Sequence, residues 1–211
     1  MFFHDVLYSF LEKHMQETQG PIFLRGRTVN LRPVRKEDLP YFLVWINDPD
    51  LRDFILPYMP MTMPEEEEWF ADLGKRKPSD VVLSIETTDG CLIGNMGMHR
   101  IDWRSRVGTT GAIIGEKDAQ GKGYGTEAKT LLLHHAFTSM NLRKICSQVI
   151  AFNKRSEAYS KKCGYKEDGV QKQHVFRRGE YHDLINLAVF WDDFKPIWEK
   201  YQMSEETHAP A

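Results

Sequence analysis

The sequence predicts an α+β fold in which helices cover a mixed β-sheet. Short apolar strand patterns alternate with stretches of helical periodicity over most of the 211 residues. Hydrophobic residues make up 41% and charged residues 27% of the chain, as in ordinary globular domains. Some predicted strands follow one another in a hairpin, and others are separated by helices. This order indicates an α+β sandwich rather than a regular doubly wound fold.

The two ends of the chain are predicted to lie outside the main domain, which spans residues 25–195. Near the N-terminus apolar residues recur at helical spacing, namely Phe3, Leu7, Phe10, Leu11 and Met15. They predict an amphipathic helical extension within residues 1–24, which either packs on its own domain or makes a homodimer contact. The chain has little apolar content after Tyr201, so we expect residues 196–211 to form a mobile C-terminal tail.

The first half of the domain is expected to contain three strands and two helices. The predicted strands are 28–32, 81–86 and 92–99, and the predicted helices are 38–46 and a segment from Thr62 onward. Thr88-Asp89-Gly90 forms the turn between the last two strands. Thr62 and Glu65 have the spacing of a capping box at a helix start. The acidic run Glu65–Glu68 either interacts favourably with the positive end of the helix dipole or forms an acidic groove for a cationic substrate.

The second half is expected to alternate more regularly between strands and helices. The predicted strands are 107–114, 144–150, 165–170 and 181–190, and the predicted helices are 124–140 and 154–162. A glycine-rich loop separates the first of these strands from the first helix. This strand, loop and helix form the segment with the clearest chemical meaning.

Composition excludes several classes of protein. The formal net charge of −2 argues against a dedicated nucleic-acid binder. The three cysteines, Cys91, Cys146 and Cys163, are too few for a disulfide framework and lack Cys-x-x-Cys spacing, so no metal is expected. No window holds the roughly 20 apolar residues that a membrane span needs, and the first residues lack the pattern of a secretory signal. We therefore expect a cytoplasmic location and no membrane partner.

Charge is distributed unevenly along the chain. Residues 121–180 contain twelve basic and five acidic residues, a formal charge of +7, which leaves −9 for the rest. A basic segment beside an acidic one suits an anionic cofactor and a cationic amine. RNA binding by the basic segment is an alternative, but no aromatic stacking motif accompanies it.

The loop Gln120–Thr126 is the most informative segment of the sequence. It follows a predicted strand and opens a predicted helix, a position where free backbone N–H groups gather around an anion. Its glycines, at positions 121, 123 and 125, would let the backbone approach a pyrophosphate closely. The spacing differs from the dinucleotide fingerprint and from the nucleotide P-loop. Taken alone, such a turn can also be purely structural.

Four segments together resemble the GNAT superfamily of acyl-CoA N-acyltransferases. Gln120–Gly125 resembles its coenzyme A pyrophosphate motif, Gln-x-x-Gly-x-Gly/Ala, and Asn153–Tyr165 resembles its downstream segment, which starts at Asn and ends in Gly-aromatic. Leu31-Arg32-Pro33 and Trp45–Asp50 are similar to the RimJ/RimL branch, the ribosomal-protein N-terminal acetyltransferases and their relatives. The resemblance runs from about Arg25 to Phe194. It implies a mostly antiparallel central sheet of about seven strands with helices on both faces, and acetyl-CoA as co-substrate without a metal.

The resemblance also implies which residues bind acetyl-CoA. The implied contacts are a splayed strand end for the pantetheine arm, the phosphate loop and a residue at the next helix start: Ile113, Ile114, Gly115, Gln120, Gly121, Lys122, Gly123, Tyr124, Gly125, Thr126 and Asn153. Asn153 is also a good N-cap residue, and the two roles are compatible. Tyr159 stands where the family has the tyrosine that protonates the departing sulfur, although a core tyrosine on an amphipathic helix would fit the same position.

The general base is where the sequence departs from the family pattern. Thr109 occupies the strand position of the usual glutamate and cannot act as a base at neutral pH. His99 and Asp102 on the preceding strand and its turn are the nearest alternatives, and His99 is better suited as a catalytic base. A structural role for His99, proton removal by a water chain, and weak catalysis stay open. His134 and His135 are adjacent on a helix and cannot form a metal pair.

The predicted activity is acetyl transfer to a primary amine by direct attack in a ternary complex. The RimJ/RimL resemblance favours the N-terminal α-amine of a protein, with a polyamine, an amino sugar or an amino acid as the alternative acceptor. A non-catalytic acyl-CoA sensor and a transferase for another acyl group are further alternatives. Acidic residues would concentrate a cationic amine at the acceptor groove, and aromatic residues of the same segment would shape it: Asp48, Asp50, Asp53, Glu65–Glu68, Phe54, Tyr58 and Trp69.

Overall fold

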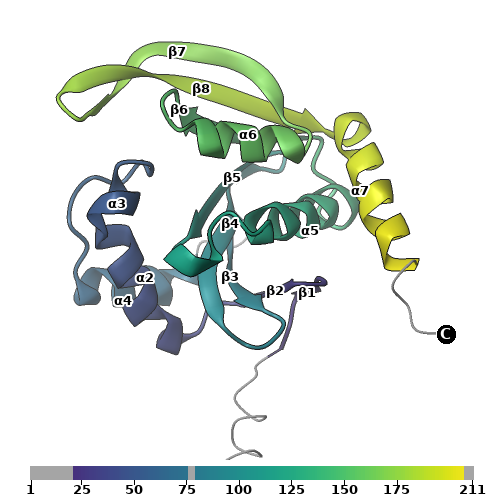
Figure 1. Ribbon diagram of the computed structural model, residues 1–211, viewed down its shortest axis with the longest axis horizontal. Helices are drawn as coiled ribbons and strands as arrows, with labels where there is room; N and C mark the ends of the chain where they lie inside the picture. Colours follow the sequence, from purple (N-terminus) through teal and green to yellow (C-terminus); the bar gives the residue numbers. More distant parts are fainter. Residues whose placement is uncertain (1–20, 76–78, 207–211) are drawn as a thin grey trace, which may run out of the picture.

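The computed structural model describes residues 21–75 and 79–206 and shows an eight-stranded sheet with helices on both faces (Figure 1). The strand order is β1-β2-β3-β4-β5-β6-β8-β7, and all neighbours are antiparallel except β5 and β6. The predicted mixed, mostly antiparallel sheet is therefore confirmed, with one strand more than expected. The helix predicted within residues 1–24 falls on residues 1–20, outside the described residues, and it stays a prediction.

The strands differ greatly in length across the sheet. They are β1 (Leu24–Arg25), β2 (Val29–Pro33), β3 (Val81–Thr87), β4 (Leu92–Asp102), β5 (Val107–Ile114), β6 (Lys144–Ile150), β7 (Lys166–Arg177) and β8 (Glu180–Phe190). The sequence did not predict β1, because two residues are too few to show a periodic pattern. β7 extends well past its predicted end at residue 170. Most of its side chains are exposed, so its pairing with β8 defines this strand rather than an apolar pattern.

The four helices predicted for the domain are present in the predicted order, and α3 (Pro49–Arg52) and α7 (Trp191–Glu206) are additional. The predicted four are α2 (Leu39–Asn47), α4 (Met63–Leu73), α5 (Tyr124–Thr138) and α6 (Lys154–Lys162), with short 3-10 turns η1 (Lys36–Asp38) and η2 (Lys117–Ala119). The predicted capping box at the start of α4 is confirmed. The Glu65 carboxylate accepts hydrogen bonds from the backbone N–H of Thr62 at 2.8 Å and from its hydroxyl at 2.6 Å.

Two hydrophobic layers hold the helices on the sheet. α5, α6 and α7 cover one face, where Ile114 of β5 packs against the main core around Phe194. α2 and α4 cover the other face, where Phe42 and Trp45 pack with Ile113. Ile113 and Ile114 are consecutive on one strand, so their side chains point to opposite faces of the sheet. The end of β5 thus contacts both helical layers.

β5 and β6 separate after a short paired stretch. They pair in parallel at three positions only, from Val107 to Thr109 of β5. Beyond this point β5 follows β4, and β6 follows β8. The hydroxyl of Thr110 lies at the start of the gap, 2.8 Å from the hydroxyl of Tyr165. Within the described residues no strand faces this edge of β5 from Gly111 onward, so its backbone groups are available to another partner.

The C-terminal helix corrects the predicted boundary of the domain. The mobile tail expected from residue 196 is wrong for residues 196–206, because they continue α7. Phe194 is fully buried, and Trp198 stacks on His134 with ring centres 3.7 Å apart. The prediction was based on the low apolar content after Tyr201. The aromatic side chains that hold the helix lie at or before that residue.

A buried ion cluster joins η1 to the first long strands. The guanidinium of Arg32 is 2.7 Å from Asp38 and 2.6 Å from Glu86, and all three side chains are buried. The hydroxyl of Ser84 donates to Asp38 over 2.6 Å. Burial alone would raise the pKa of Asp38, but hydrogen bonds from Arg32, Ser84 and the Arg35 backbone lower it below its ordinary value. Asp38 therefore stays ionised at neutral pH, and its contacts with Arg32 and Ser84 hold η1 against the sheet.

Candidate active site

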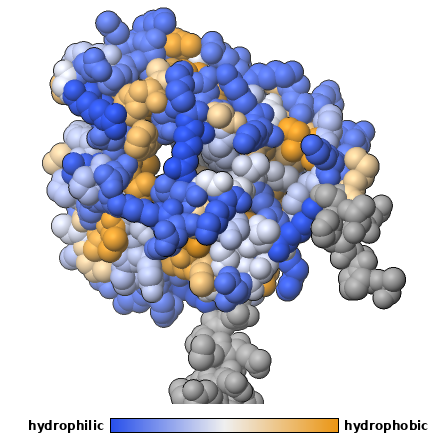
Figure 2. All heavy atoms as spheres, viewed as in Figure 1, coloured by the Kyte–Doolittle hydropathy of each residue, from blue (hydrophilic) through white to orange (hydrophobic). Residues whose placement is uncertain are grey.

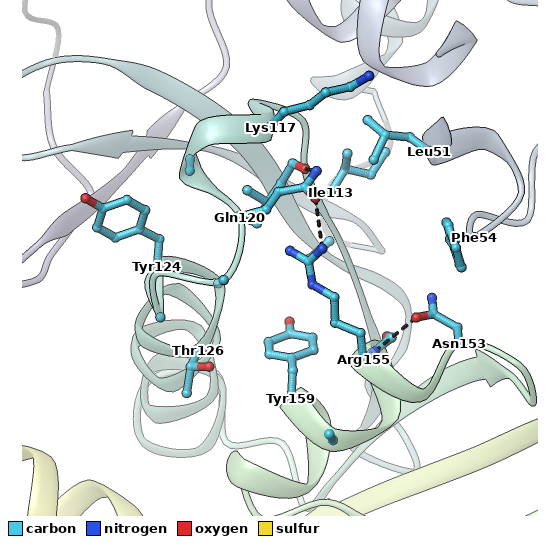
Figure 3. A pocket seen from close by; sticks show the side chains of 18 of the residues that line it. Leu51, Phe54, Ile113, Lys117, Gln120, Tyr124, Thr126, Asn153, Arg155 and Tyr159 are labelled. Carbon is cyan, nitrogen blue, oxygen red and sulfur yellow. Dashed lines mark hydrogen bonds between the residues drawn. The ribbon is translucent and has the colours of Figure 1, made fainter. Parts of the chain in front are cut away.

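A cavity of about 650 Å³ lies beside the end of β5, between the start of α5, α6 and α3 (Figure 3). Most of the predicted cofactor residues line it: Ile113, Ile114, Gln120, Gly121, Gly123, Tyr124, Gly125, Thr126 and Asn153. Gly115 and Lys122 do not line it. The space-filling view shows a hollow between α3 and α6 with hydrophobic residues toward α3 (Figure 2), where Leu51 and Phe54 contribute to the lining.

The loop before α5 presents its backbone to this cavity. Gly121 and Gly123 have φ angles of +80° and +92°, which L side chains rarely adopt. Apart from its chain neighbours, no atom of the described residues lies within 4 Å of the position that a Cβ would take at either glycine, so the space beside the loop is open. In the described part of the chain, the backbone N–H groups of residues 121–125 donate to no acceptor. Free donors at a helix start form a site for an anion such as a pyrophosphate.

Arg155 reaches across the cavity from α6 (Figure 3). Its Nη1 donates to Oε1 of Gln120 over 2.9 Å, and Nε2 of Gln120 donates to the carbonyl of Ile114 over 2.9 Å. Gln120 thus ties the phosphate loop to the end of β5, while Arg155 and Lys162 add positive charge to the wall opposite the loop. Sequence reasoning missed Arg155, although its position two residues after Asn153, at the start of the helix that faces the loop, was a usable signal.

Two of the residues predicted to bind the cofactor, Gly115 and Asn153, have structural roles. A Cβ at Gly115 would lie 1.9 Å from the ring of Trp45, so only glycine lets that ring pack here. The structure therefore places Gly115 against α2 rather than at the cavity. Oδ1 of Asn153 accepts the N–H of Ser156 at 3.0 Å and caps α6, while the same residue lines the cavity. Both roles considered for Asn153 are compatible with this geometry.

Tyr159 points its hydroxyl from α6 into the cavity (Figure 3). The Oη atom is buried and has no hydrogen-bond partner among the described residues. Burial raises the pKa of Tyr159 well above its ordinary value, so the side chain is a neutral phenol. Tyr165 differs, because its buried hydroxyl bonds to Thr110. An unpaired buried donor at a cavity wall can be satisfied by a bound ligand, which distinguishes Tyr159 from an ordinary core tyrosine.

His99 lies on β4 directly opposite Thr109 of β5, on the sheet face opposite Tyr159. Its Nδ1 is 3.5 Å from Oδ1 of Asp80. A Cβ at Gly111 would lie 3.6 Å from Nε2 of His99, so the imidazole sits beside the unpaired stretch of β5. His99 itself does not line the cavity, and the structure therefore does not bring the two predicted catalytic side chains into contact.

The two histidines on α5 pack against aromatic side chains. His134 stacks on Trp198, and the ring of His135 meets Phe23 edge to face at 4.9 Å. Among residues 21–75 and 79–206, no group of three His, Cys, Asp or Glu side chains could hold a metal ion. None of the described helices is long and apolar enough to cross a membrane.

The three aspartates expected to attract a cationic amine have basic partners. Lys117 lies 2.7 Å from Asp50 and 3.4 Å from Asp48. Asp53 is 2.7 Å from Nε of Arg178. Of these acids only Asp50 lines the cavity. The field expected from these aspartates is therefore largely neutralised by neighbouring bases. In the acidic run Glu65–Glu68, Glu67 lies 3.3 Å from Lys36, and none of the four glutamates lines the cavity.

The turn between β7 and β8 reaches over the segment that follows α3 (Figure 1). Nη2 of Arg177 donates to the carbonyls of Ile55 and Leu56, at 3.1 and 2.7 Å. The guanidinium carbon of Arg178 lies 5.5 Å from the ring centre of Phe54, a cavity-lining residue. Exposed apolar side chains follow on the same segment, namely Leu56, Tyr58 and Met59. These contacts form a rim beside the cavity that is apolar and cationic rather than acidic.

Comparisons with curated proteins agree on one kind of domain. The family model described as acetyltransferase (GNAT) domain matches residues 28–166. "Putative ribosomal N-acetyltransferase YdaF" of Bacillus subtilis (strain 168) is 30% identical over 111 residues, which cover 53% of this chain and 58% of that protein. The match thus spans little more than half of that relative. Spermidine N(1)-acetyltransferase of Escherichia coli (strain K12) is 26% identical over 173 residues, 78% of this chain and 87% of that protein.

Solved structures show the same arrangement of sheet and helices. The crystal structure of spermidine N-acetyltransferase from Vibrio cholerae in complex with CoA and spermine gives a TM-score of 0.74 at 22% identity. The superposition covers 80% of this chain and 98% of that chain. At this level of identity the likeness establishes a shared fold.

Proposed function

The chain belongs to the GNAT acetyltransferase family, and we propose that it transfers the acetyl group of acetyl-CoA to the N-terminal α-amine of a polypeptide. Transfer from acetyl-CoA to an amine follows from the family. The acceptor and the residues that act on it are the proposal. The observation that carries the choice of acceptor is the largely compensated charge beside the cavity, where Asp48 and Asp50 share Lys117 and Asp53 pairs with Arg178.

The donor side of the reaction uses backbone groups that have no partner within the described chain, together with two cationic side chains. The free amides of residues 121–125 bind the pyrophosphate at the start of α5, with Arg155 and Lys162 as cationic partners. The open edge of β5 at Gly111 and Ala112 offers backbone donors and acceptors to the amides of the pantetheine arm. A backbone N–H aimed at the thioester carbonyl would polarise it for attack.

Tyr159 acts as the general acid in this proposal. The amine nitrogen bonds to the acetyl carbon as the carbon–sulfur bond breaks, and the electron pair of that bond leaves with sulfur. Tyr159 then gives its phenolic proton to the sulfur. The buried hydroxyl, which has no partner in the part of the chain that the structure describes, supports this role, because it can bond to the leaving group.

His99 removes the proton from the attacking amine in this proposal, with Asp80 as its partner. The imidazole lies next to Gly111 on the face of β5 opposite Tyr159. Acid and base on opposite faces of the strand suit a reaction in which the amine and the leaving sulfur lie on opposite sides of the acetyl carbon. Because His99 does not line the cavity, the transfer runs through a water molecule.

A polypeptide N-terminus fits the rim better than a polyamine does. A polyamine carries several positive charges and needs several carboxylates without basic partners. Asp50 is the only acidic residue of the described chain that lines the cavity, and Lys117 is 2.7 Å from it. The exposed side chains of Leu56, Tyr58 and Met59 can instead contact the residues that follow a peptide N-terminus.

Spermidine is the second candidate acceptor, and the comparisons favour it. A curated relative and a solved structure with the same fold are both spermidine N-acetyltransferases by name. The two candidate acceptors should differ in their salt dependence. The attraction of a polyamine depends on several charges, so it weakens more steeply with rising ionic strength than that of a single α-amine.

The acceptor is tested by measuring CoA release with a peptide bearing a free N-terminus, the same peptide with a blocked N-terminus, and spermidine. We expect turnover of the free peptide, none of the blocked peptide and at most weak turnover of spermidine. Tyr58→Ser together with Met59→Ser should raise KM for the peptide and leave the acetyl-CoA Kd unchanged. Met203→Ser, an exposed methionine on α7, is the matched control. Turnover of spermidine alone would overturn the polypeptide acceptor.

A further inference from the structure

Lys129 on α5 is buried behind the proposed acid, with 2% of its surface exposed. Its Nζ lies 4.2 Å from the ring centre of Tyr159 and 4.8 Å from that of Tyr165. Its one hydrogen bond within the described residues is a 3.4 Å contact with the hydroxyl of Ser160. No carboxylate within the described chain contributes to its charge state. Two aromatic faces and one hydroxyl therefore surround this ammonium group.

Packing alone does not require a charged side chain at this position. The neighbouring core residues of α5 are apolar, among them Ala128, Leu131 and Leu132. A buried ammonium loses its hydration, so an uncharged side chain of similar length would be cheaper here. Lys129 does not line the cavity, so it does not contact the substrates directly. The desolvation of its ammonium group destabilises the fold, and the group lies against the ring of Tyr159. These two facts indicate a functional role that acts through that ring.

We propose that Lys129 is a positioning residue whose ammonium group holds the ring of Tyr159 and stabilises the phenolate that forms when Tyr159 protonates the departing sulfur. This inference rests on the proposed role of Tyr159 as general acid. The attraction between a cation and an aromatic face exists already in the neutral phenol. It becomes much stronger once the ring carries a negative charge, because the interaction of two opposite charges is strong at a buried site.

The proton transfer needs such support. Burial makes the Tyr159 phenol a weaker acid, because it raises the cost of the anion left behind. In the reaction the carbon–sulfur bond breaks with its electron pair on sulfur, the sulfur takes the proton of Tyr159, and Tyr159 becomes an anion. A cation on the ring face lowers the energy of that anion relative to the neutral phenol. The phenolate then regains a proton from solvent. The attacking amine releases one proton to solvent, so the number of protons is conserved over the whole reaction.

The charge of Lys129 depends on pH in a range that experiments can reach. Burial lowers the pKa of Lys129 to about 8, while the nearby Cys163 thiol opposes this effect. The titratable groups that face it are Tyr159, Tyr165 and Cys163, and Lys162 acts on that cysteine in turn. Lys129 is therefore mostly protonated at pH 7 and mostly neutral above pH 9.

A double-mutant cycle tests the inference. Lys129→Met, Tyr159→Phe and the double variant are compared for kcat at saturating substrates and for the Kd of acetyl-CoA, with the same peptide acceptor. We expect Lys129→Met to lower kcat about tenfold or more at pH 7, with an unchanged Kd and no loss of thermal stability. In the Tyr159→Phe background the same change should have no further effect, because no phenolate forms. Lys161→Met, an exposed lysine on α6, is the control for loss of one charge.

A pH profile separates electrostatic from merely structural action. The ratio of the kcat of the native protein to that of Lys129→Met should be largest near pH 7 and approach one above pH 9. Deprotonation of the acceptor amine affects both proteins alike and cancels in this ratio. Lys129→Leu provides a second uncharged variant and should give the same profile.

The outcomes distinguish this inference from the proposed function. Equal losses of kcat in both backgrounds, or a ratio that does not change with pH, would overturn the role of Lys129 and leave Tyr159 as the acid. An unchanged kcat in Tyr159→Phe, with chemistry rate-limiting, would remove the acid and the inference together.

Discussion

At the scale of single residues, Gly123 shows how backbone conformation and open space combine at the phosphate loop. Its φ of +92° strains any L side chain, yet nothing lies within 4 Å of the Cβ position. A substitution therefore changes the loop conformation and the space for a ligand without creating a clash inside the protein. The same reasoning applies to Gly121, but not to Gly125, where a Cβ would meet Ile114 at an ordinary contact distance.

We expect Gly123→Ala to weaken acetyl-CoA binding about tenfold, because strain shifts the loop amides, and Gly123→Trp to abolish binding, because the ring fills the pyrophosphate space. Calorimetric titration with acetyl-CoA measures both effects. Gly74→Trp is the matched control, since Gly74 also has open space around it but has an ordinary φ of −66°. An unchanged affinity in Gly123→Trp would place the cofactor elsewhere.

Tyr159→Phe should lower kcat by about 10²–10⁴ with little change in the acetyl-CoA Kd, as expected for loss of a general acid. Rapid-quench measurement of the chemical step provides the comparison. Tyr165→Phe is the control, because it removes a buried hydroxyl that bonds to Thr110 and lies outside the cavity lining. The control should lose stability and keep its kcat. A chemical step as fast in Tyr159→Phe as in the native protein would show that Tyr159 is not the general acid and has only a packing role.

His99→Gln should lower kcat/KM about 100-fold at pH 7, because the amine must then lose its proton without a base. The defect should shrink as the pH rises past about 8, where an α-amine is already neutral. A pH profile of kcat/KM with the peptide acceptor measures this convergence. Asp80→Asn should show a smaller defect of the same form. A loss of rate that is equal at every pH would indicate a structural role for His99.

At the scale of elements, the relation between β5 and β6 creates the site. Three paired positions followed by divergence leave the end of β5 open, and the loop before α5 continues from that end. α5 is held in turn by α7: the hydroxyl of Tyr201 donates to the Glu127 carboxylate, which also accepts the backbone N–H of Thr28. The segment first expected to be a mobile tail thus supports the helix that carries the phosphate loop.

Trp198→Ala should reduce the free energy of unfolding by about 3 kcal/mol, because it removes an aromatic side chain stacked on His134. Acetyl-CoA affinity of the remaining folded protein should stay within about twofold, since Trp198 lies outside the cavity lining. Denaturant unfolding and calorimetry measure the two quantities. Met203→Ala on the exposed face of α7 is the control and should change neither. A stability equal to that of the native protein would mean that α7 does not hold α5.

At the scale of the whole molecule, buried charge and global stability are linked through Asp38. Its pKa is lower in the folded chain than the ordinary value, so the ion cluster stabilises the fold at neutral pH. This contribution is lost as the pH falls below about 4, where the unfolded chain takes up a proton first. The native protein should therefore lose stability steeply in acid.

Asp38→Asn should cost about 3 kcal/mol at pH 7, because it leaves Arg32 buried with Glu86 as its remaining ion partner. The variant should also show a shallower loss of unfolding free energy between pH 5 and 3 than the native protein. Urea titrations over that range provide the measurement. Glu199→Gln breaks an exposed pair with Lys195 and should behave as the native protein does. Parallel pH curves for Asp38→Asn and the native protein would exclude the cluster as a source of acid sensitivity.

The sequence allowed seven of the eight described strands, four of the six described α-helices and the phosphate-loop side of the cavity to be predicted. Local signals carry this information: the Thr62 capping box is a matter of residues three apart, and the glycines at 121 and 123 reflect a local demand for positive φ. Asn153 as an N-cap is equally local. The role of Gly115 was not predictable, because the Trp45 ring that requires a glycine there is 70 positions earlier in the chain.

The amino-acid sequence by itself determined the fold class, the family resemblance and the residues that bear the phosphate loop, because each depends on neighbours along the chain. Only the tertiary structure decided which charges remain without compensation. It paired Asp50 with Lys117 and Asp53 with Arg178, and it buried Lys129 behind Tyr159. The physical reason is that charge compensation and burial depend on distances through space, between groups that the sequence places up to 125 residues apart.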